Sequence, residues 1–215
     1  GISPGDEVIV PPWSMSATAM APICYGGIPV FADIEDQTFC IEPDEVNKQI
    51  TKKTRAIIAV NLFGHPAQLA RLRELADHHG LYLIEDNAQG IGSTYISSNN
   101  SNLKSGTIGD IGTTSFFPSK NLGCYGDGGA ILTNDSKLAG IMRSTANHGQ
   151  GKKYSIERLG VNSRLDTMQA AILLQKLKVF NEEIIRRKQI AAYYSKHLSE
   201  YLCIPTLHKD VTSAW

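Results

Sequence analysis

The near-continuous apolar run from Arg55 to Leu62 constrains the fold more than any other feature of this chain. Short runs of this kind are typical of strands that are buried on both faces of a parallel sheet. Pro66 to His79 follows with apolar residues at three- and four-residue spacing, which predicts an amphipathic helix that ends at Gly80. Leu81 to Ile84 predicts the next buried strand. Strand, helix and strand in this order indicate parallel strands joined by a right-handed crossover.

The same alternation extends along most of the chain. Further strands are predicted at 7–10, 28–32, 110–117 and 129–133, and further helices at 16–25, 42–50 and 135–144. The Ser-, Asn- and Gly-rich stretch Ser93 to Gly109 is interpreted as a surface excursion. No Gly or Pro interrupts the helical pattern from Asp166 to about Glu200, so one long helix, bent at most, is expected there. The pattern predicts a three-layer α/β sandwich with a mostly parallel sheet, from which the long helix leads toward a second domain.

Charge and composition narrow the classes of partner. Lys and Arg together number 21, as do Asp and Glu, so the formal net charge is zero. Without a block of like charge, neither nucleic acid nor an anionic membrane is expected as a partner. No apolar run reaches the ~18 residues of a membrane span. The four cysteines are scattered without metal-ligand spacing, so no metal site is expected and a reduced, cytoplasmic compartment is the simplest expectation.

Two segments at predicted strand ends carry groups suited to chemistry. Asp86 follows a buried strand, and ligands of open α/β sheets bind beyond the carboxyl ends of strands. Asp86 either faces such a ligand or caps a following helix. Lys120 lies on a Pro-containing turn beside several glycines. A partly desolvated lysine can act as a nucleophile toward carbonyls, and the alternatives are a phosphate-binding or merely exposed lysine.

Together, Asp86 and Lys120 are the pair that pyridoxal phosphate needs. The lysine forms a Schiff base with the cofactor, and the acid keeps the pyridine nitrogen protonated so that the ring acts as an electron sink. No phosphate-binding loop with the G-x-x-x-x-G-K-[ST] pattern and no dinucleotide-binding G-x-G-x-x-G after a strand is found.

In these and further segments the chain resembles the DegT/DnrJ/EryC1/StrS sugar aminotransferases, which are pyridoxal-phosphate enzymes of the aspartate-aminotransferase fold. The matching segments occur in family order: Gly5–Ile9, Pro29–Ile34, Glu85–Gln89, Gly106–Ile111, Ser115–Gly123, Tyr125–Gly129, His148–Gly149 and Gly160–Ala171. The resemblance implies a cofactor-binding large domain over 1–165, a long connecting helix over 166–200 and the start of a truncated small domain over 201–215. It also implies that a phosphate-gripping helix N-terminus precedes Gly1 in complete members.

The resemblance assigns roles to individual residues. Lys120 would bind the cofactor covalently and shuttle a proton, and Asp86 would pair with the pyridinium nitrogen. Gln89 would bond the phenolic oxygen of the cofactor, and Ser115 would bind its phosphate. Asn162 would reach the phosphate of a neighbouring subunit, because family sites form at a homodimer interface.

Two further positions keep alternatives open. The guanidinium fork of Arg164 suits a substrate carboxylate or phosphate, and it would equally suit an interface salt bridge. Family members carry an aromatic residue, which stacks on the cofactor, where this chain has Met15. Either Met15 covers the ring through its polarisable sulfur, or Trp13 does so, or Trp13 only packs.

The implied activity is transfer of an amino group from glutamate to a nucleotide-linked keto-sugar, in amino-sugar, polysaccharide or glycoside biosynthesis. Lys120 favours transamination, since a dehydrating branch of the family has His at this position. The segments 115–129 and 148–169 resemble the branch that makes 3-amino sugars on UDP or dTDP carriers, and a C-4 keto-sugar stays open. The alternative is a catalytically impaired or regulatory relative.

Overall fold

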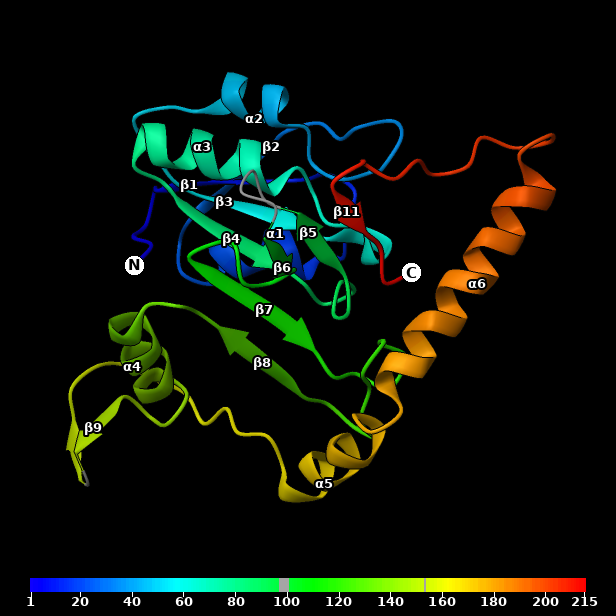
Figure 1. The fold of residues 1–215 in the computed structure, drawn as a ribbon. Coiled ribbons are helices and arrows are strands. Elements are labelled where there is room, and N and C mark those ends of the chain that lie inside the picture. Colours follow the sequence, from blue (N-terminus) through cyan, green and yellow to red (C-terminus); the bar gives the residue numbers. More distant parts are fainter. Residues whose placement is uncertain (97–100, 153) are drawn as a thin grey trace.

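The computed structural model describes residues 1–96, 101–152 and 154–215, and Figure 1 shows how its elements are arranged. Its centre is a six-stranded sheet with the order β2-β1-β3-β4-β7-β8. The strands of this sheet are β1 (Glu7–Val10), β2 (Ile28–Phe31), β3 (Thr54–Val60), β4 (Tyr82–Asp86), β7 (Ile111–Ser115) and β8 (Gly129–Leu132). All neighbours pair in parallel except β7 and β8, which are antiparallel. The predicted mostly parallel sheet is therefore confirmed.

The helices of the chain are α1 (Ala17–Ile23), α2 (Pro43–Gln49), α3 (Leu69–His79), α4 (Ser136–Thr145), α5 (Thr167–Lys176) and α6 (Phe180–Leu198), with a 3-10 turn η1 at Leu62–Gly64. The helix predicted from Pro66 begins three residues later, at Leu69, and ends as predicted at Gly80. The Gly80 residue takes the left-handed conformation (φ 64°) and returns its N–H to the carbonyl oxygens of Ala76 and Asp77.

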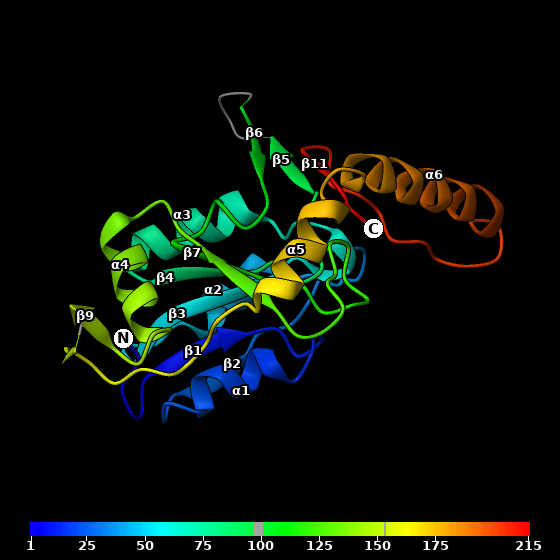
Figure 2. The same cartoon turned by 90° about the horizontal axis from the view of Figure 1, so that it is seen from below.

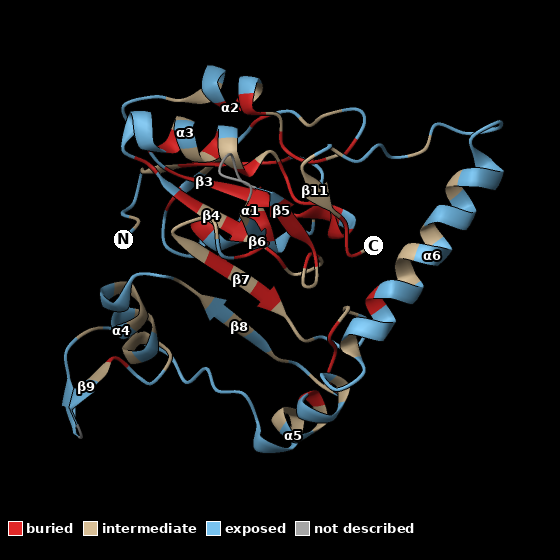
Figure 3. Ribbon diagram, in the orientation of Figure 1, coloured by how far each residue is buried: buried red, intermediate tan, exposed pale blue. Residues whose placement is uncertain are grey.

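Side chains on the two faces of the sheet form two separate cores, which gives the three layers. On one face, Ile9 and Ile57 lie in a cluster with Leu69, Leu72 and Ala76 of α3. On the other face, a smaller cluster is formed by Val8, Val10, Ala56 and Ile58, against which Ala19 of α1 packs. Figure 3 shows the burial concentrated in the central strands. This period-two alternation of apolar residues follows from the pleat of the strands.

The long helix predicted over 166–200 is two helices, α5 and α6, so the expectation of one continuous helix was wrong. Residues 177–179 form a turn, in which the N–H of Val179 bonds to the carbonyl of Lys176. Leu173 and Phe180, one on each side of the turn, both pack with Leu122 and Cys124.

The stretch 93–109 is only partly a surface excursion. It contains β5 (Thr94–Ile96) and β6 (Asn102–Lys104), which form a three-stranded antiparallel sheet with β11 (Val211–Thr212) in the order β11-β5-β6. The Ser93 and Ser105 hydroxyls are buried and bond to each other at 2.7 Å. Figure 2 shows this small sheet standing apart from the central one, beside the start of α6. Residues 97–100 of the predicted excursion lie outside the described residues.

The last residues pack back against earlier parts of the chain, namely the small sheet and the η1 turn. Val211 pairs with Tyr95, and the N–H of Ala214 bonds to the carbonyl of Gly64 at 2.9 Å. A short hairpin of β9 (Gln150–Lys152) and β10 (Ser155–Ile156) lies beyond α4. Of the helices within the described ranges, none combines the length and the apolar character needed to cross a bilayer.

Candidate active site

The carboxyl ends of β4 and β7 lie side by side and carry two of the predicted site residues. Asp86 ends β4 and stands in register with Thr113 of β7, and Ser115 ends β7. The N–H of Asn87 continues this pairing by bonding to the carbonyl of Thr113 at 2.7 Å. Parallel pairing brings both strand ends to the same edge, the place where open α/β sheets bind ligands.

A buried carboxylate fixes this edge from within. Glu85 is fully buried, on the face opposite to Asp86. It accepts hydrogen bonds from the backbone N–H groups of Gly106, Ile108 and Gly109 at 2.6–2.7 Å, and from the amide of Asn61 at 3.2 Å. These four donors satisfy a carboxylate that would otherwise be costly to bury. Sequence reasoning assigned Glu85 no role, although an acid at an inward-facing strand position is itself a signal of such a site.

The Asp86 carboxylate is held at both oxygens. Oδ1 accepts from the N–H of Ala88 at 3.1 Å, and Oδ2 accepts from the hydroxyl of Thr18 on α1 at 3.3 Å. The contact to Ala88 is the local cap that sequence reasoning left as an alternative, but residues 88–92 form turns and not a helix. Asp86 is only partly buried, so the capping bonds leave it accessible at the strand ends.

Lys120 lies on a tight turn that follows β7. Its N–H bonds to the carbonyl of Phe117 at 2.9 Å, and the residue is half-buried. A side chain at Gly123 would place its Cβ 2.6 Å from the carbonyl oxygen of Pro118, so the turn requires glycine there. Leu122 and Cys124 anchor the turn in the cluster beneath α5 and α6.

Asn121 joins the lysine turn to the segment that follows Asp86. Its side-chain amide donates to the carbonyl oxygens of Gln89 at 3.4 Å and Ile91 at 3.3 Å. The lysine turn and the acid therefore belong to one connected edge of the sheet, and not to separate surfaces. No local sequence pattern indicates this cross-link.

Gln89 and Ser115 lie at the same edge, and the side-chain oxygen of each already accepts a hydrogen bond from a backbone N–H group. The side-chain oxygen of Gln89 accepts from the N–H of Phe63 at 2.7 Å, and Phe63 has a left-handed backbone (φ 54°) that presents this N–H. The amide nitrogen of Gln89 is then the end left to donate. Ser115 Oγ accepts from the N–H of Phe117 at 3.2 Å, which leaves its hydroxyl hydrogen for another acceptor.

Asn162 and Arg164 are not brought to this edge within the chain. Both border an open hollow of about 830 Å³ between β7, β8 and α4, and the residues that line it do not include Asp86, Gln89 or Lys120. The backbone of Asn162 forms an isolated bridge with Asn147. The role of Asn162 at the site of a neighbouring subunit, implied by the resemblance, stays a prediction.

Met15 and Trp13 lie in the loop that leads into α1. Met15 is 72% exposed and Trp13 is 57% exposed. The same loop carries Ser14, whose hydroxyl lies 3.0 Å from that of Thr18. Both side chains are exposed, and the role of either over the cofactor ring stays a prediction.

The groups with the largest pKa shifts lie away from this edge. Burial lowers the pKa of His65 to about 4, helped by the nearby His208. Burial raises the pKa of the Cys40 thiol to about 11 and that of Tyr95 to about 12. His208 in turn contacts Glu35 at 2.9 Å. These groups lie where the segment 206–212 packs against earlier parts of the chain, through the His65–His208 ring contact and the pairing of Val211 with Tyr95, and not at the edge that carries Asp86.

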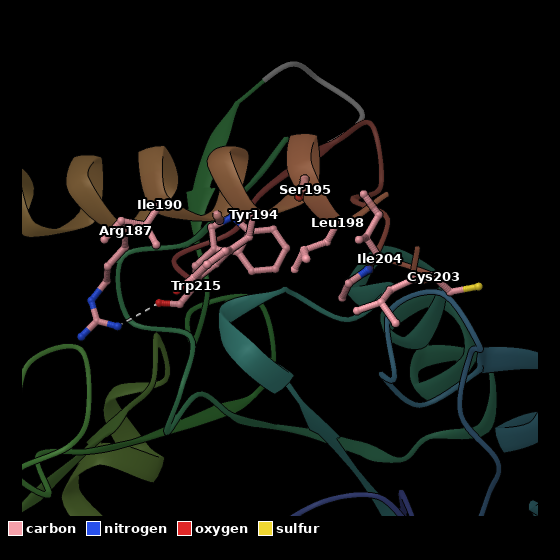
Figure 4. A pocket seen from close by; sticks show the side chains of 11 residues that line it. Arg187, Ile190, Tyr194, Ser195, Leu198, Cys203, Ile204 and Trp215 are labelled. Carbon is pink, nitrogen blue, oxygen red and sulfur yellow. Dashed lines mark hydrogen bonds between the residues drawn. The ribbon is translucent and has the colours of Figure 1, made fainter. Parts of the chain in front are cut away.

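A second hollow, of about 490 Å³, lies between α6 and residues 202–205 (Figure 4). It is lined mostly by apolar side chains, and Arg187 donates across it to the backbone oxygen of Trp215 at 3.2 Å. None of the predicted site residues lines it. Among the described residues, no group of three or more His, Cys, Asp or Glu side chains is placed to hold a metal ion, and the four cysteines are free.

Comparison with characterised proteins gives a consistent result over the whole chain. A UDP-2-acetamido-2-deoxy-3-oxo-D-glucuronate aminotransferase from Pseudomonas aeruginosa is 46% identical over 200 residues, which cover 93% of this chain and 54% of the relative. The crystal structure of DesV from S. venezuelae, in complex with a ketimine intermediate, is 42% identical with a TM-score of 0.94 and covers 100% of this chain. That match spans 57% of the DesV chain.

A third match holds a cofactor. The crystal structure of NtdA from Bacillus subtilis with bound cofactor PMP is 36% identical, with a TM-score of 0.87, over 100% of this chain and 49% of that chain. This chain thus spans about half the length of the relatives it matches. The sequence model of the DegT/DnrJ/EryC1/StrS aminotransferase family matches residues 1–215, and the protein belongs to this family.

Proposed function

We propose that this protein is part of a pyridoxal-phosphate-dependent aminotransferase that transfers the amino group of glutamate to a nucleotide-linked keto-sugar. The observation that carries the proposal is the edge at which Asp86 ends β4 and the Lys120 turn is tied to the Asp86–Ile91 segment through Asn121. The two groups that pyridoxal phosphate requires, a lysine and an acid, come from neighbouring strand ends.

The residues at this edge fit the cofactor. Asp86 is an acceptor with one donor on each oxygen, which leaves lone pairs for the ring nitrogen proton. Gln89 has its oxygen engaged and its amide nitrogen left to donate to a phenolic oxygen. Ser115 has a hydroxyl hydrogen left for a phosphate oxygen. The donor and acceptor set therefore matches a ring with a protonated nitrogen, an anionic oxygen and a phosphate.

When bound, pyridoxal phosphate supplies an electron sink that stabilises negative charge on the substrate carbon. Lys120 would hold the cofactor covalently through Nζ, and the free Nζ amine would be the base that accepts a proton from one carbon and donates it to another. Asp86 would hold the proton on the ring nitrogen, because a carboxylate favours the cationic ring.

Several roles depend on a second subunit or on the substrate. A homodimer would bring Asn162 of one subunit to the cofactor phosphate of the other. Within one chain, Asn162 borders a hollow that Asp86, Gln89 and Lys120 do not line. The Arg164 guanidinium would bind a carboxylate or phosphate of the substrate. Met15 would cover the cofactor ring, with Trp13 as the alternative. The reduced thiols are compatible with a cytoplasmic enzyme.

The P. aeruginosa relative is named for a UDP-linked 3-oxo sugar, which supports amination at C-3 on a UDP carrier. The test is amination of a panel of UDP- and dTDP-linked 3-keto and 4-keto sugars by the complete protein, with glutamate as the donor. Transfer to a 3-keto sugar is expected, and Lys120→Ala abolishes it while Lys196→Ala on the exposed face of α6 does not. Absence of transfer to every member of the panel contradicts the proposal.

A further inference from the structure

A threonine next to the Asp86 carboxylate has no role in the account so far. Thr18 lies near the start of α1 and is only 5% exposed. Its hydroxyl lies 3.3 Å from Asp86 Oδ2, across 68 residues of sequence, and 3.0 Å from the hydroxyl of Ser14. Three polar side chains from two segments thus form one chain of hydrogen bonds that ends on the carboxylate.

The direction of these hydrogen bonds follows from the groups involved. An ionised carboxylate only accepts, so the single hydrogen of the Thr18 hydroxyl points to Asp86. Thr18 Oγ1 then has only lone pairs left, and Ser14 donates to it. The relay runs from Ser14 through Thr18 to Asp86, and it connects the loop that carries Trp13 and Met15 to the strand end.

The hydroxyl of Thr18 has no comparable partner in its own helix. In helices a Thr hydroxyl often bonds the carbonyl three or four residues before it, whereas the Thr18 hydroxyl is directed to Asp86 on another element. Valine would fill the same buried space without a hydroxyl. A threonine at this place therefore matters through its hydrogen bond rather than through its shape.

We infer that Thr18 is a positioning residue whose hydroxyl orients the Asp86 carboxylate toward the ring nitrogen of the cofactor. The inference rests on the proposed function. Oδ1 is fixed by the N–H of Ala88 and Oδ2 by Thr18, so the rotation of the carboxyl group is determined before the cofactor binds. Preorganised acceptors of this kind cost no rearrangement when the ligand arrives.

The test compares Thr18→Val, which removes the hydroxyl and keeps the shape, with Thr18→Ser, which restores the hydroxyl. The matched control is Thr51→Val, because Thr51 also donates to a carboxylate, that of Glu7, far from the site in sequence and on the exposed surface. Each full-length variant is titrated with pyridoxal phosphate, and the absorption band of the bound cofactor is followed in affinity and pH dependence.

Thr18→Val is expected to weaken cofactor affinity by about tenfold, the effect of losing one hydrogen bond to a charged group. The pH midpoint of the absorption band should move upward, because a less firmly held carboxylate leaves less positive charge on the ring to oppose protonation of the lysine imine. The cofactor affinity of Thr18→Ser should stay within about twofold of that of the unsubstituted protein, and the affinity of Thr51→Val should equal that of the unsubstituted protein. A purely structural role would not move the pH midpoint.

Equal affinity and midpoint in Thr18→Val and the unsubstituted protein overturn the inference, as does an equal loss in Thr18→Val and Thr18→Ser. If Thr18→Val does not fold, Ser14→Ala decides, since removal of the relay donor should shift the midpoint in the same direction and an unmoved midpoint overturns the inference. A protein without any Lys120-dependent band overturns the proposed function, and the inference with it. A Lys120-dependent band whose affinity and pH midpoint do not change in the Thr18 and Ser14 variants overturns only the inference about Thr18.

Discussion

The Glu85 carboxylate accepts a hydrogen bond from the backbone N–H of Gly106, with 2.6 Å between the oxygen and the nitrogen. Two more N–H groups of the same loop bond to its second oxygen. This contact ties the end of β4, which presents Asp86, to the loop that leads into β7, which presents Ser115 and is followed by the Lys120 turn. The geometry of the candidate site thus depends on a buried charge one residue away from it.

Glu85→Gln should lower the free energy of unfolding by about 2–4 kcal/mol, because one of the amide positions would face N–H donors and leave them unsatisfied. Urea unfolding followed by circular dichroism measures this loss. Glu200→Gln, at an exposed position after α6, is the control and should stay within about 0.5 kcal/mol. A Glu85→Gln protein as stable as the control would show that the buried hydrogen bonds do not hold the edge together.

Asp86→Asn should leave the fold intact and weaken cofactor binding. Asparagine has the same shape and keeps an oxygen for one of the two capping donors, so the free energy of unfolding should change by less than about 1 kcal/mol. The loss of negative charge removes the interaction with a protonated ring nitrogen, so the affinity for pyridoxal phosphate should fall at least tenfold. Equilibrium titration measures the affinity, and unchanged binding would remove Asp86 from the site.

Protein stability should fall between pH 6.5 and pH 4 because of His65. The residue is 4% exposed, and neither ring nitrogen has a partner among the described residues. Burial, and then His208, lower its pKa from 6.5 to about 4 in the folded state. As the pH falls through this window, His65 becomes protonated in the unfolded chain but stays neutral in the folded chain. The free energy of unfolding therefore decreases by up to about 3 kcal/mol.

The test for His65 is urea unfolding at pH 7.5 and at pH 5. His65→Phe keeps an aromatic ring in place but does not titrate, so its loss of stability between the two pH values should be smaller. His208, Glu35 and Asp210 also act on the His65 ring and are present in both proteins, so the difference between the two proteins isolates the effect of His65. An identical pH dependence in the two proteins would contradict the assignment.

Gly123→Ala should disturb the lysine turn. The new Cβ would lie 2.6 Å from the Pro118 carbonyl oxygen and 2.7 Å from that of Phe117, so the backbone of the turn must move. The fraction of protein that forms a covalent bond to pyridoxal phosphate should drop, as measured by absorbance. Gly140→Ala on α4 meets nothing within 4 Å and should be neutral or stabilise the helix by up to about 1 kcal/mol. Equal behaviour of the two variants would mean that the turn does not position Lys120.

The central sheet and the two strand-end segments were predictable from local pattern. Apolar runs such as Arg55–Leu62 indicate buried parallel strands, and the acid that follows Ile84 marks a strand end. Gly80 ended α3 as predicted because a left-handed residue suits glycine. These signals are short-range, so a single sequence carries them.

Other features depend on partners distant in sequence and leave no periodic signal. The pairing of Val211 with Tyr95 involves strands of two and three residues, too short for a period-two pattern. The break after Lys176 falls in a stretch without Gly or Pro, so no local signal marks it. The Asn121 cross-link joins two turns, and the Thr18 contact joins α1 to the end of β4, so only the fold brings these partners together. The role of Asn162 at the site of a neighbouring subunit stays a prediction.

The central claim, that Lys120 holds the cofactor, has one direct measurement. The complete protein is incubated with pyridoxal phosphate and reduced with sodium borohydride, which makes a lysine Schiff base permanent, and the modified peptide is mapped by mass spectrometry. The account predicts one dominant adduct, on Lys120, which Lys120→Ala removes. A dominant adduct on another lysine, or reduction without any adduct, would contradict it.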